Sequence, residues 1–238
     1  MSGRRLLVGI GDDDDGDAMA LALRLVDPAG SDVVPLHVEA RHRRPASVAR
    51  GLIDSARDRG ADVVVLGTGR TSLQVAHGAP CAVAVAPAGY RESGPFRHIG
   101  VAYDGSAEAD GALRTAYDLA GRDRAAVTLY WTIVDGRVAY AGIPSPEFDS
   151  LAQDVRRGAQ EALDAAADSA PEGVNPETVL LRGAPAQDIA KEATGVVDLL
   201  VVGARRRGLL SRTLAGSVSD QLLLGVSEPV LVVPGGTG

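Results

Sequence analysis

The segment from Gly203 to Ser217 contains residue types that bind an anion. The apolar run 199–202 ends at Gly203, and Gly216 and Ser217 begin a helical pattern after twelve intervening residues. The first N–H groups of a helix have no partner within it, so they attract an anion, and glycine lets that anion approach the backbone closely. A strand, a glycine-containing loop and a helix in this order therefore predict a phosphate site.

Asp104, Gly105 and Ser106 form a second polar group, which directly follows the apolar run 99–103. The carboxyl ends of parallel strands lie at one edge of their sheet. If the strand 99–103 neighbours the strand 199–202, this turn and Gly203 meet at a topological switch point, where doubly wound sheets bind their ligands.

Other familiar chemical motifs are missing from the sequence. A Walker A phosphate loop requires Gly-Lys followed by Ser or Thr, and the only lysine, Lys191, stands between Ala190 and Glu192. No G-x-G-x-x-G motif opens a helix, and the four histidines lack metal-ligand spacing. No nucleophile with a base, and no carboxylate pair, is arranged for catalysis. We therefore predict no catalytic residues and no metal site built by the protein.

Composition indicates a soluble globular protein with aliphatic cores, since 45% of the residues are apolar and only 3% are aromatic. The net charge of −7 argues against nucleic-acid binding, which needs a basic face. Cys81 is the single cysteine, which excludes an internal disulfide, and no apolar run is long enough to span a membrane. We expect a cytoplasmic protein without membrane or nucleic-acid partners.

Apolar strand patterns alternate with helical patterns along the whole chain, as in parallel sheets covered by helices on both faces. The clearest helical pattern runs from about 147 to 167, where Leu151, Val155, Ala159 and Leu163 recur every fourth residue. The predicted fold class is α/β, with doubly wound, Rossmann-like parallel sheets. The expected strands are 6–10, 33–38, 63–66 and 82–85 in the first half and 99–103, 126–134, 177–181, 199–202 and 230–233 in the second.

The two halves of the chain repeat each other with unequal spacing. The matching pairs are Asp17 with Asp110, 93 residues apart, the runs 62–67 and 198–203, 136 apart, and Pro80 with Pro229, 149 apart. The growing offset predicts that the first half lacks one helix–strand pair and a later loop. Whether its strand 33–38 corresponds to the second or the third strand of the longer half stays open. The predicted domains are 1–88, a truncated copy, and 98–238, a complete copy, joined by the linker 89–97.

The second half resembles a universal stress protein domain, and the whole chain resembles a tandem member of that family. The family's phosphate motif is Gly, two residues, Gly, nine residues, Gly and then Ser or Thr, followed by a helix and a Pro-Val-Leu-Val-Val strand. Here Gly203, Arg206, Gly216 and Ser217 occupy the four motif positions, and Pro-Val-Leu-Val-Val stands at 229–233. The resemblance covers the second half well and the first half only as a reduced copy.

The resemblance implies ATP with Mg²⁺ as the ligand of the second half. Asp104, with Gly105 and Ser106, is expected near the ribose or adenine, and Ile133 is expected to line the base pocket. The residues expected around the phosphates are Gly203, Arg206, Gly216, Ser217 and Val218.

Arg206 departs from the family pattern, which has glycine at that position. Its side chain either occupies the phosphate space or binds phosphate through its guanidinium. The first half departs further, because Thr68 and a helical pattern follow Gly67 directly, and Gly11 stands where the second half has Asp104. The carboxylates of 12–15 would repel a triphosphate unless a metal intervened, and an acidic first helical turn explains them better than a metal site does. We predict no nucleotide in the first half.

Three functions are consistent with these features. The first is a regulatory module that binds ATP in its second half and hydrolyses it slowly or not at all. The alternative is a nucleotide-free structural or adaptor protein that works by dimerisation, and the third is a related α/β nucleotide-processing enzyme. By family resemblance the last strands of the two domains, 82–85 and 230–233, meet across a pseudo-twofold axis, so the first half acts as an internal dimer partner. A homodimer of whole chains is a further expectation.

Overall fold

The computed structural model describes residues 4–11, 16–26, 30–38, 45–134, 146–204 and 218–235. The first half contains β1 (Arg5–Gly11), α1 (Asp17–Leu25), β2 (Asp32–Val38), α2 (Pro45–Arg59), β3 (Val63–Gly67), α3 (Arg70–Gly78) and β4 (Ala82–Ala86). The second half contains β5 (His98–Ala102), α4 (Ala107–Asp123), β6 (Ala126–Ile133), α6 (Pro146–Asp168), β7 (Glu177–Arg182), α7 (Pro185–Ala193), β8 (Leu199–Ala204), α8 (Val218–Gly225) and β9 (Val230–Pro234). The predicted strands are all present, with bounds shifted by one or two residues.

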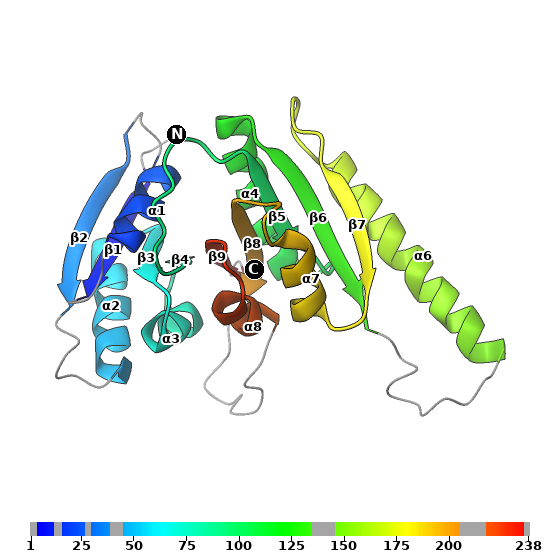
Figure 1. Ribbon diagram of the computed structural model, residues 1–238, viewed down its shortest axis with the longest axis horizontal. Coiled ribbons are helices and arrows are strands. Elements are labelled where there is room, and N and C mark those ends of the chain that lie inside the picture. The colour runs from blue at the N-terminus through cyan, green and yellow to red at the C-terminus, as the bar shows by residue number, and fades with distance from the viewer. Residues whose placement is uncertain are drawn as a thin grey trace.

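These strands form one sheet in the order β2-β1-β3-β4-β9-β8-β5-β6-β7 (Figure 1). Neighbouring strands run parallel, as the continuous Val and Leu runs predicted. The exception is the pair β4 and β9, which run antiparallel with Ala84 opposite Leu231. The two halves therefore join edge to edge through their last strands, and the predicted α/β, doubly wound fold class is confirmed.

The strand that the first half lacks is the counterpart of β7. In the second half β6 lies beside β5, and β7 lies outside β6. In the first half β2 takes the place beside β1, and among the described residues no further strand lies outside it. The retained middle strand is thus the second strand, which settles the question that the sequence left open.

The sequence analysis matched Pro80 with Pro229, and this match is wrong by two residues. Val64 on β3 pairs with Val83 on β4, and Leu200 on β8 pairs with Val230 on β9. Since Val64 and Leu200 stand 136 residues apart, the equivalent of Val83 is Val230, at an offset of 147. The offset of 149 between Pro80 and Pro229 reflects turns of different length before the last strands. Proline suits both turns without occupying equivalent positions in them.

Helices cover both faces of the sheet and enclose one core on each face. The helices α1, α4 and α6 pack on one face, whereas α2, α3, α7 and α8 pack on the other. Each core contains buried residues from both halves, such as Leu6 with Ile99 on one face and Val64 with Leu200 on the other. A fully buried side chain of this kind contributes about 1.5–3 kcal/mol, so the shared cores stabilise the junction of the halves.

The apolar stripe of α6 is only half buried. Ala159 and Leu163 are buried, but Leu151 is 59% exposed and Val155 is 48% exposed. Figure 1 shows the reason, because the first part of α6 extends beyond the edge of the sheet. The spacing predicted the helix correctly and its buried length incorrectly.

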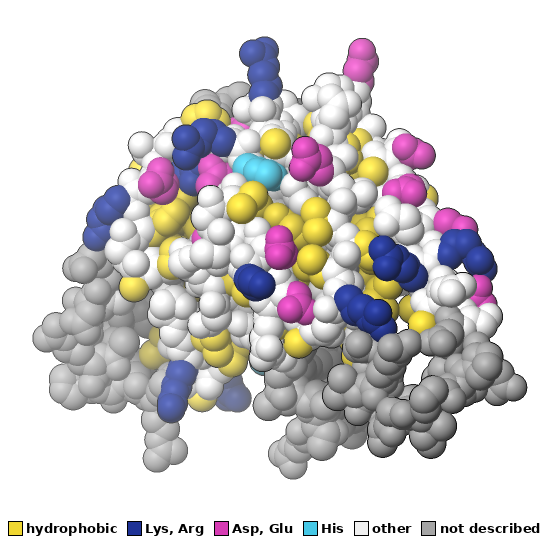
Figure 2. All heavy atoms as spheres, turned by 45° about the vertical axis from the view of Figure 1, so that its right-hand side comes forward, with side chains coloured by type: hydrophobic (Ala, Val, Ile, Leu, Met, Phe, Trp, Pro, Cys, Tyr) yellow, Lys and Arg dark blue, Asp and Glu magenta, His cyan; other side chains and the backbone are white. Residues whose placement is uncertain are grey.

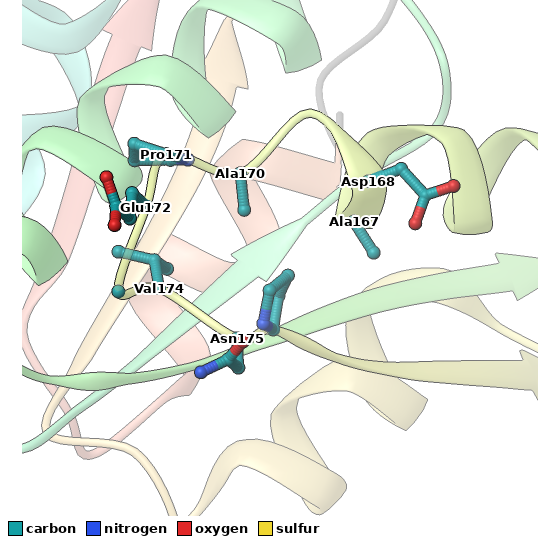
Figure 3. A pocket seen from close by; sticks show the side chains of 9 residues that line it. Ala167, Asp168, Ala170, Pro171, Glu172, Val174 and Asn175 are labelled. Atoms are coloured by element: carbon teal, nitrogen blue, oxygen red, sulfur yellow. The ribbon is translucent and has the colours of Figure 1, made fainter.

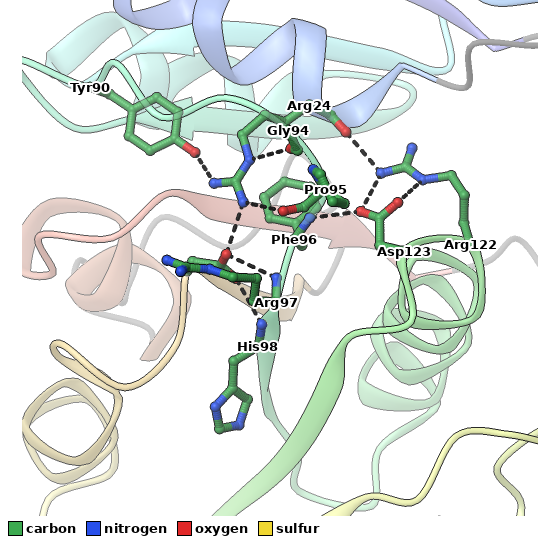
Figure 4. A network of polar contacts seen from close by, with 10 residues as sticks. Arg24, Tyr90, Gly94, Pro95, Phe96, Arg97, His98, Arg122 and Asp123 are labelled. Carbon is green, nitrogen blue, oxygen red and sulfur yellow. Dashed lines mark hydrogen bonds and ion pairs between the residues drawn. The ribbon is translucent and has the colours of Figure 1, made fainter.

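A polar network ties the two halves together at the amino end of β8 (Figure 4). Arg24, on α1, is 5% exposed, and its guanidinium donates to Gly94 O, Pro95 O, Tyr90 Oη and Asp198 Oδ2, the last at 2.8 Å. It also lies 4.1 Å from the centre of the Phe96 ring. A second network lies beside it, where Arg122 of α4 donates to the carbonyl oxygens of residues 24, 25 and 26 at the end of α1.

The surface carries both signs of charge. On the face shown in Figure 2, Lys or Arg and Asp or Glu side chains are interspersed with hydrophobic ones. Within the described ranges, no helix has the length and apolar character that a membrane span requires.

Candidate functional site

Asp104, Gly105 and Ser106 form the turn between β5 and α4. Asp104 Oδ1 accepts hydrogen bonds from the backbone N–H of Ser106, at 3.1 Å, and from its hydroxyl. Ser106 Oγ in turn caps α4 by accepting from the N–H of Ala109 at 3.2 Å. These bonds hold the exposed Asp104 side chain at the carboxyl end of β5, and within the described chain its other oxygen, Oδ2, has no hydrogen-bond partner.

Gly105 is the residue on which this turn bends. Its φ of +71° lies in the left-handed region that favours glycine, and a Cβ there would stand 3.0 Å from Trp131 Cη2. Trp131 packs edge-to-face against Tyr103, with ring centroids 5.8 Å apart, and Tyr103 Oη donates to Asp110 Oδ1 at 2.8 Å. Burial, followed by the hydrogen bond to Asp110, raises the pKa of Tyr103 to about 12, so Tyr103 stays neutral and acts as a donor.

Trp131 and Tyr103 are site residues that the sequence reasoning missed. Both are aromatic residues at the carboxyl ends of strands, in a chain with a single tryptophan. The scarcity of aromatic residues in this chain is the sequence signal that would have identified these two.

Gly203 lies beside this turn, as predicted, because β8 pairs with β5 and Val202 stands opposite Ala102. A Cβ on Gly203 would stand 2.6 Å from the backbone carbon and oxygen of Glu108 and 2.8 Å from Ala109 N. Gly203 therefore lets the end of β8 contact the first turn of α4. This requirement is independent of any ligand, and the sequence reasoning did not anticipate it.

Ile133 is the last residue of β6 and is partly exposed, as is Trp131 two positions before it. Residues two apart on a strand share a face, so Ile133 extends the surface that Trp131 begins. Its carbonyl oxygen accepts from Gly183 N at 3.0 Å, which fixes the turn that leads into α7. Ile133 thus lies at the same edge of the sheet as Asp104.

Of the residues expected around the phosphates, Arg206, Gly216 and Ser217 lie outside the described residues. Val218 begins α8 and is partly exposed. The structure thus brings together Asp104, Gly105, Ser106 and Gly203, with Ile133 at the same edge of the sheet.

The start of α8 also carries a carboxylate. Asp220, in its first turn, is 8% exposed, and its Oδ1 lies 2.7 Å from Nε2 of His77 in the last turn of α3. An ionised carboxylate only accepts hydrogen bonds, so Nε2 carries the donated proton. Within the described chain, no cluster of three or more His, Cys, Asp or Glu side chains is arranged to hold a metal ion.

The corresponding edge of the first half is built differently. Only Thr68 and Gly69 separate β3 from α3, whereas residues 205–217 stand between β8 and α8. Thr68 N donates to Ala86 O at 2.9 Å, so the short turn follows the last strand closely. Gly11 ends β1 as expected, and the carboxylates of 12–15 lie outside the described residues.

A pocket of about 410 Å³ lies elsewhere, at the opposite end of the β7 strand (Figure 3). The end of α6 and residues 170–176, which lead into β7, line it and contribute the carboxylates of Asp168 and Glu172. Two carboxylates disfavour a phosphate, so this pocket does not suit the predicted ligand.

Comparison with known proteins relates these features to one family. The model of the Universal stress protein family matches residues 95–234. A universal stress protein of Mycobacterium tuberculosis is 27% identical over 218 residues, which cover 84% of this chain and 73% of that protein.

Two solved structures share the fold. A putative universal stress protein of Pseudomonas aeruginosa superposes with a TM-score of 0.59 at 18% identity, over 97% of this chain and 82% of the other. A universal stress protein of Archaeoglobus fulgidus superposes with a TM-score of 0.58 at 15% identity, over 98% of this chain and 86% of the other. Both alignments extend through the two halves.

Proposed function

The chain belongs to the universal stress protein family, and from this premise we propose that it is a cytoplasmic regulatory module that binds ATP with Mg²⁺ in its second half. The first half serves as a built-in dimer partner, joined through β4 and β9. No catalytic residue is assigned, and ATP turnover is slow or absent.

The arrangement of Asp104 beside Gly203 is the observation that carries the proposal. The pairing of β5 with β8 puts the polar turn and Gly203 at one switch point of the sheet. The unpartnered Asp104 Oδ2 fits a hydroxyl donor such as a ribose, and the surface of Trp131 and Ile133 fits a planar base.

The proposal includes Mg²⁺ because this ion accompanies the phosphates of a bound nucleotide. Mg²⁺ is commonly held by one or two carboxylates together with substrate phosphates and waters rather than by a cage of protein ligands. The phosphates themselves would lie against Gly203, Gly216, Ser217 and Val218, with Arg206 as either a ligand or an obstacle.

The nucleotide-free adaptor is a second candidate that one observation favours. Asp220 places a buried carboxylate at the start of α8, where it already complements the positive end of the helix. A protein that works only through its surfaces needs no further anion there.

Titration of Mg·ATP into the protein separates these candidates, with Trp131 fluorescence and calorimetry as readouts. Trp131 is the only tryptophan and lies in the proposed site, so binding is expected to change its emission. Asp104→Ala is expected to weaken binding about tenfold through the lost charged hydrogen bond. Absence of heat and of an emission change at millimolar Mg·ATP would overturn the proposal.

Two further variants sharpen the titration. Asp168→Ala alters the acidic pocket at the opposite end of β7 and is expected to leave the affinity unchanged. Arg206→Gly restores the family glycine. A gain in affinity would show that Arg206 occupies phosphate space, and a loss would show that its guanidinium binds the phosphate.

A further inference from the structure

The apolar stripe of α6 continues past the point where the sheet ends. In the second part of the helix Ala159 and Leu163 are 4% and 0% exposed. One and two turns earlier, Val155 and Leu151 are 48% and 59% exposed, and every residue from 151 to 158 is exposed. This part of α6 extends beyond the edge strand β7, so the side that packs on the sheet further along is uncovered here by the described chain (Figure 1).

β7 also presents unpaired backbone groups at this edge. It is the last strand in the sheet order, and no described strand pairs with its outer side. Gly183 N donates to Ile133 O, and backbone groups alternate in direction along a strand, so every second residue before Gly183 faces β6. The N–H and C=O groups of Thr178 and Leu180 therefore point outward. Such a row is a template for a further strand.

The opposite edge of the sheet, formed by β2, is blocked. Asp32 N donates to Arg4 O, so by the same alternation the backbone nitrogen of Pro35 points outward. Proline has no N–H and interrupts the row of donors, which is one way in which edge strands are protected from pairing. β7 contains no proline, so the two edges of the sheet differ in their capacity to pair.

We propose that β7 and residues 151–158 of α6 form the interface of a homodimer. The β7 strands of two copies pair antiparallel, so that the sheet continues from one copy into the other. The exposed part of each α6 then covers the β7 edge of the other copy, where its apolar side finds the sheet that its own copy does not supply. This inference goes beyond the proposed nucleotide site and does not depend on it.

The charges and the topology favour a second copy over an unrelated strand. Glu177 and Arg182 stand exposed at the two ends of β7, and antiparallel pairing of identical strands sets the acidic end of one beside the basic end of the other. The chain already contains an edge-to-edge junction of this type, since β4 and β9 pair antiparallel. In a twofold dimer each copy also supplies one open edge and one extended helix and receives both. Because Pro35 blocks β2, association stops at two copies.

The test of the strand pairing is the mass of the full chain from micromolar to millimolar concentration, measured by sedimentation velocity and light scattering. The mass is expected to rise from that of one chain, 24.4 kDa, to twice that value and then to stay constant. Thr178→Pro removes an outward N–H without removing a bond to β6, and is expected to weaken the dimer about tenfold or more. Thr178→Val keeps the N–H and is the matched control, with the dimer expected to be unchanged.

A double variant tests the contribution of the helix. Leu151→Glu combined with Val155→Glu puts charges into the contact and is expected to weaken the dimer about tenfold or more. Since both side chains are exposed in the single chain, the melting temperature at low concentration is expected to stay the same. Leu23→Glu is the control, because Leu23 lies on α1 in the first half, is 64% exposed and is expected to leave the dimer unchanged.

Amide hydrogen exchange of the wild type gives a test that needs no variant. The outward N–H groups of Thr178 and Leu180 are expected to be protected at high concentration and to exchange rapidly at low concentration. Equal exchange at both concentrations would contradict the strand pairing.

Several outcomes would overturn the proposal. A wild type that keeps the mass of one chain throughout would leave the β7 edge to an unrelated strand, and a mass that rises past two chains would exclude a closed dimer. A dimer as stable in Thr178→Pro as in the wild type would have its interface elsewhere. A dimer that Thr178→Pro weakens but the double variant does not would refute the role of α6.

Discussion

The loops that follow β3 and β8 start from equivalent glycines, Gly67 and Gly203, and then differ completely. In the first half two residues lead into α3, whereas in the second half residues 205–217 intervene before α8. Both helices nevertheless pack on the same face of the sheet and contribute to the same core. Two residues therefore suffice to lead from a strand to a helix on this face of the sheet.

At the amino end of β8, by contrast, the two halves of the chain contact each other. There the halves are not separate copies but are linked through Arg24, Asp198 and the chain segment between them. The network of Arg24 and Asp198 thus lies at the amino end of β8, whereas the connections that differ between the halves follow the carboxyl ends of β3 and β8. Four experiments test this division, from the largest expected effect to the smallest.

Arg24→Ala tests whether the amino-end network holds the halves together. The substitution removes the cation that pairs with Asp198 and the donor to two backbone carbonyls, and breaking a buried ion pair costs about 3–5 kcal/mol of unfolding free energy. Urea denaturation measures the loss. Arg91→Ala is the matched control, because the Arg91 side chain that pairs with Asp17 is 53% exposed, so the pair is worth less than about 1 kcal/mol. Equal losses in the two variants would contradict the assigned role.

Gly203→Ala and Gly67→Ala compare the two loop starts directly. A Cβ at Gly203 would meet the backbone of α4 at 2.6 Å, whereas a Cβ at Gly67 would have no atom within 4 Å in the described chain. We expect a loss of about 1–3 kcal/mol for Gly203→Ala from overpacking, and a change within about 0.5 kcal/mol for Gly67→Ala. Thermal denaturation measures both, and a reversed order would show that the close approach of β8 to α4 is not required.

The acid sensitivity of Asp198 gives a third test. Burial alone would raise the pKa of its carboxyl, but hydrogen bonds from Arg97 N, Arg24 and His98 N outweigh burial and lower it. Because the pKa of Asp198 is lower in the folded state than in the unfolded state, its ionised form stabilises the fold at pH values above the unfolded-state pKa of about 3.9. This stabilisation is lost as the pH falls through the pKa of the folded state. The stability gap between wild type and Asp198→Asn is therefore expected to shrink below about pH 4 in urea titrations. A gap that stays constant to pH 2 would show that the carboxylate charge is not involved.

The last prediction concerns Cys81, for which we expect a slow reaction of the thiol and a small effect on stability. Burial, followed by the charge of Asp62, raises the pKa of its thiol to about 11, so little thiolate exists at pH 8. Its reaction with a disulfide reagent is expected to be much slower in the folded protein than in urea. Cys81→Ala is expected to change stability by less than about 1 kcal/mol, because the residue is only half-buried and precedes β4.

Much of the fold was predictable because it follows from local patterns. The apolar runs predicted the strands, and the offset between the halves predicted the missing helix–strand pair. The place of Asp104 beside Gly203 followed from the strand order of doubly wound sheets. These inferences need only periodicity and connection rules, which act over short distances in the chain.

The remaining features depend on contacts between distant segments. Arg24 and Asp198 stand 174 residues apart and His77 and Asp220 stand 143 apart, and no spacing rule joins them. The exposed first part of α6 depends on where the sheet ends, which Leu151 and Val155 do not reveal. Gly203 resembled a phosphate-loop glycine by its motif, and only packing shows its contact with α4.

The antiparallel pairing of β4 with β9 has a consequence for assembly. Because one covalent chain supplies both strands, their effective concentration is fixed by the linker, and dilution does not separate them. Each side of this junction is also encoded by its own codons, so a substitution alters one side without its symmetric copy. The junction therefore does not require two identical halves, and the two-residue turn after β3 is one place where they differ.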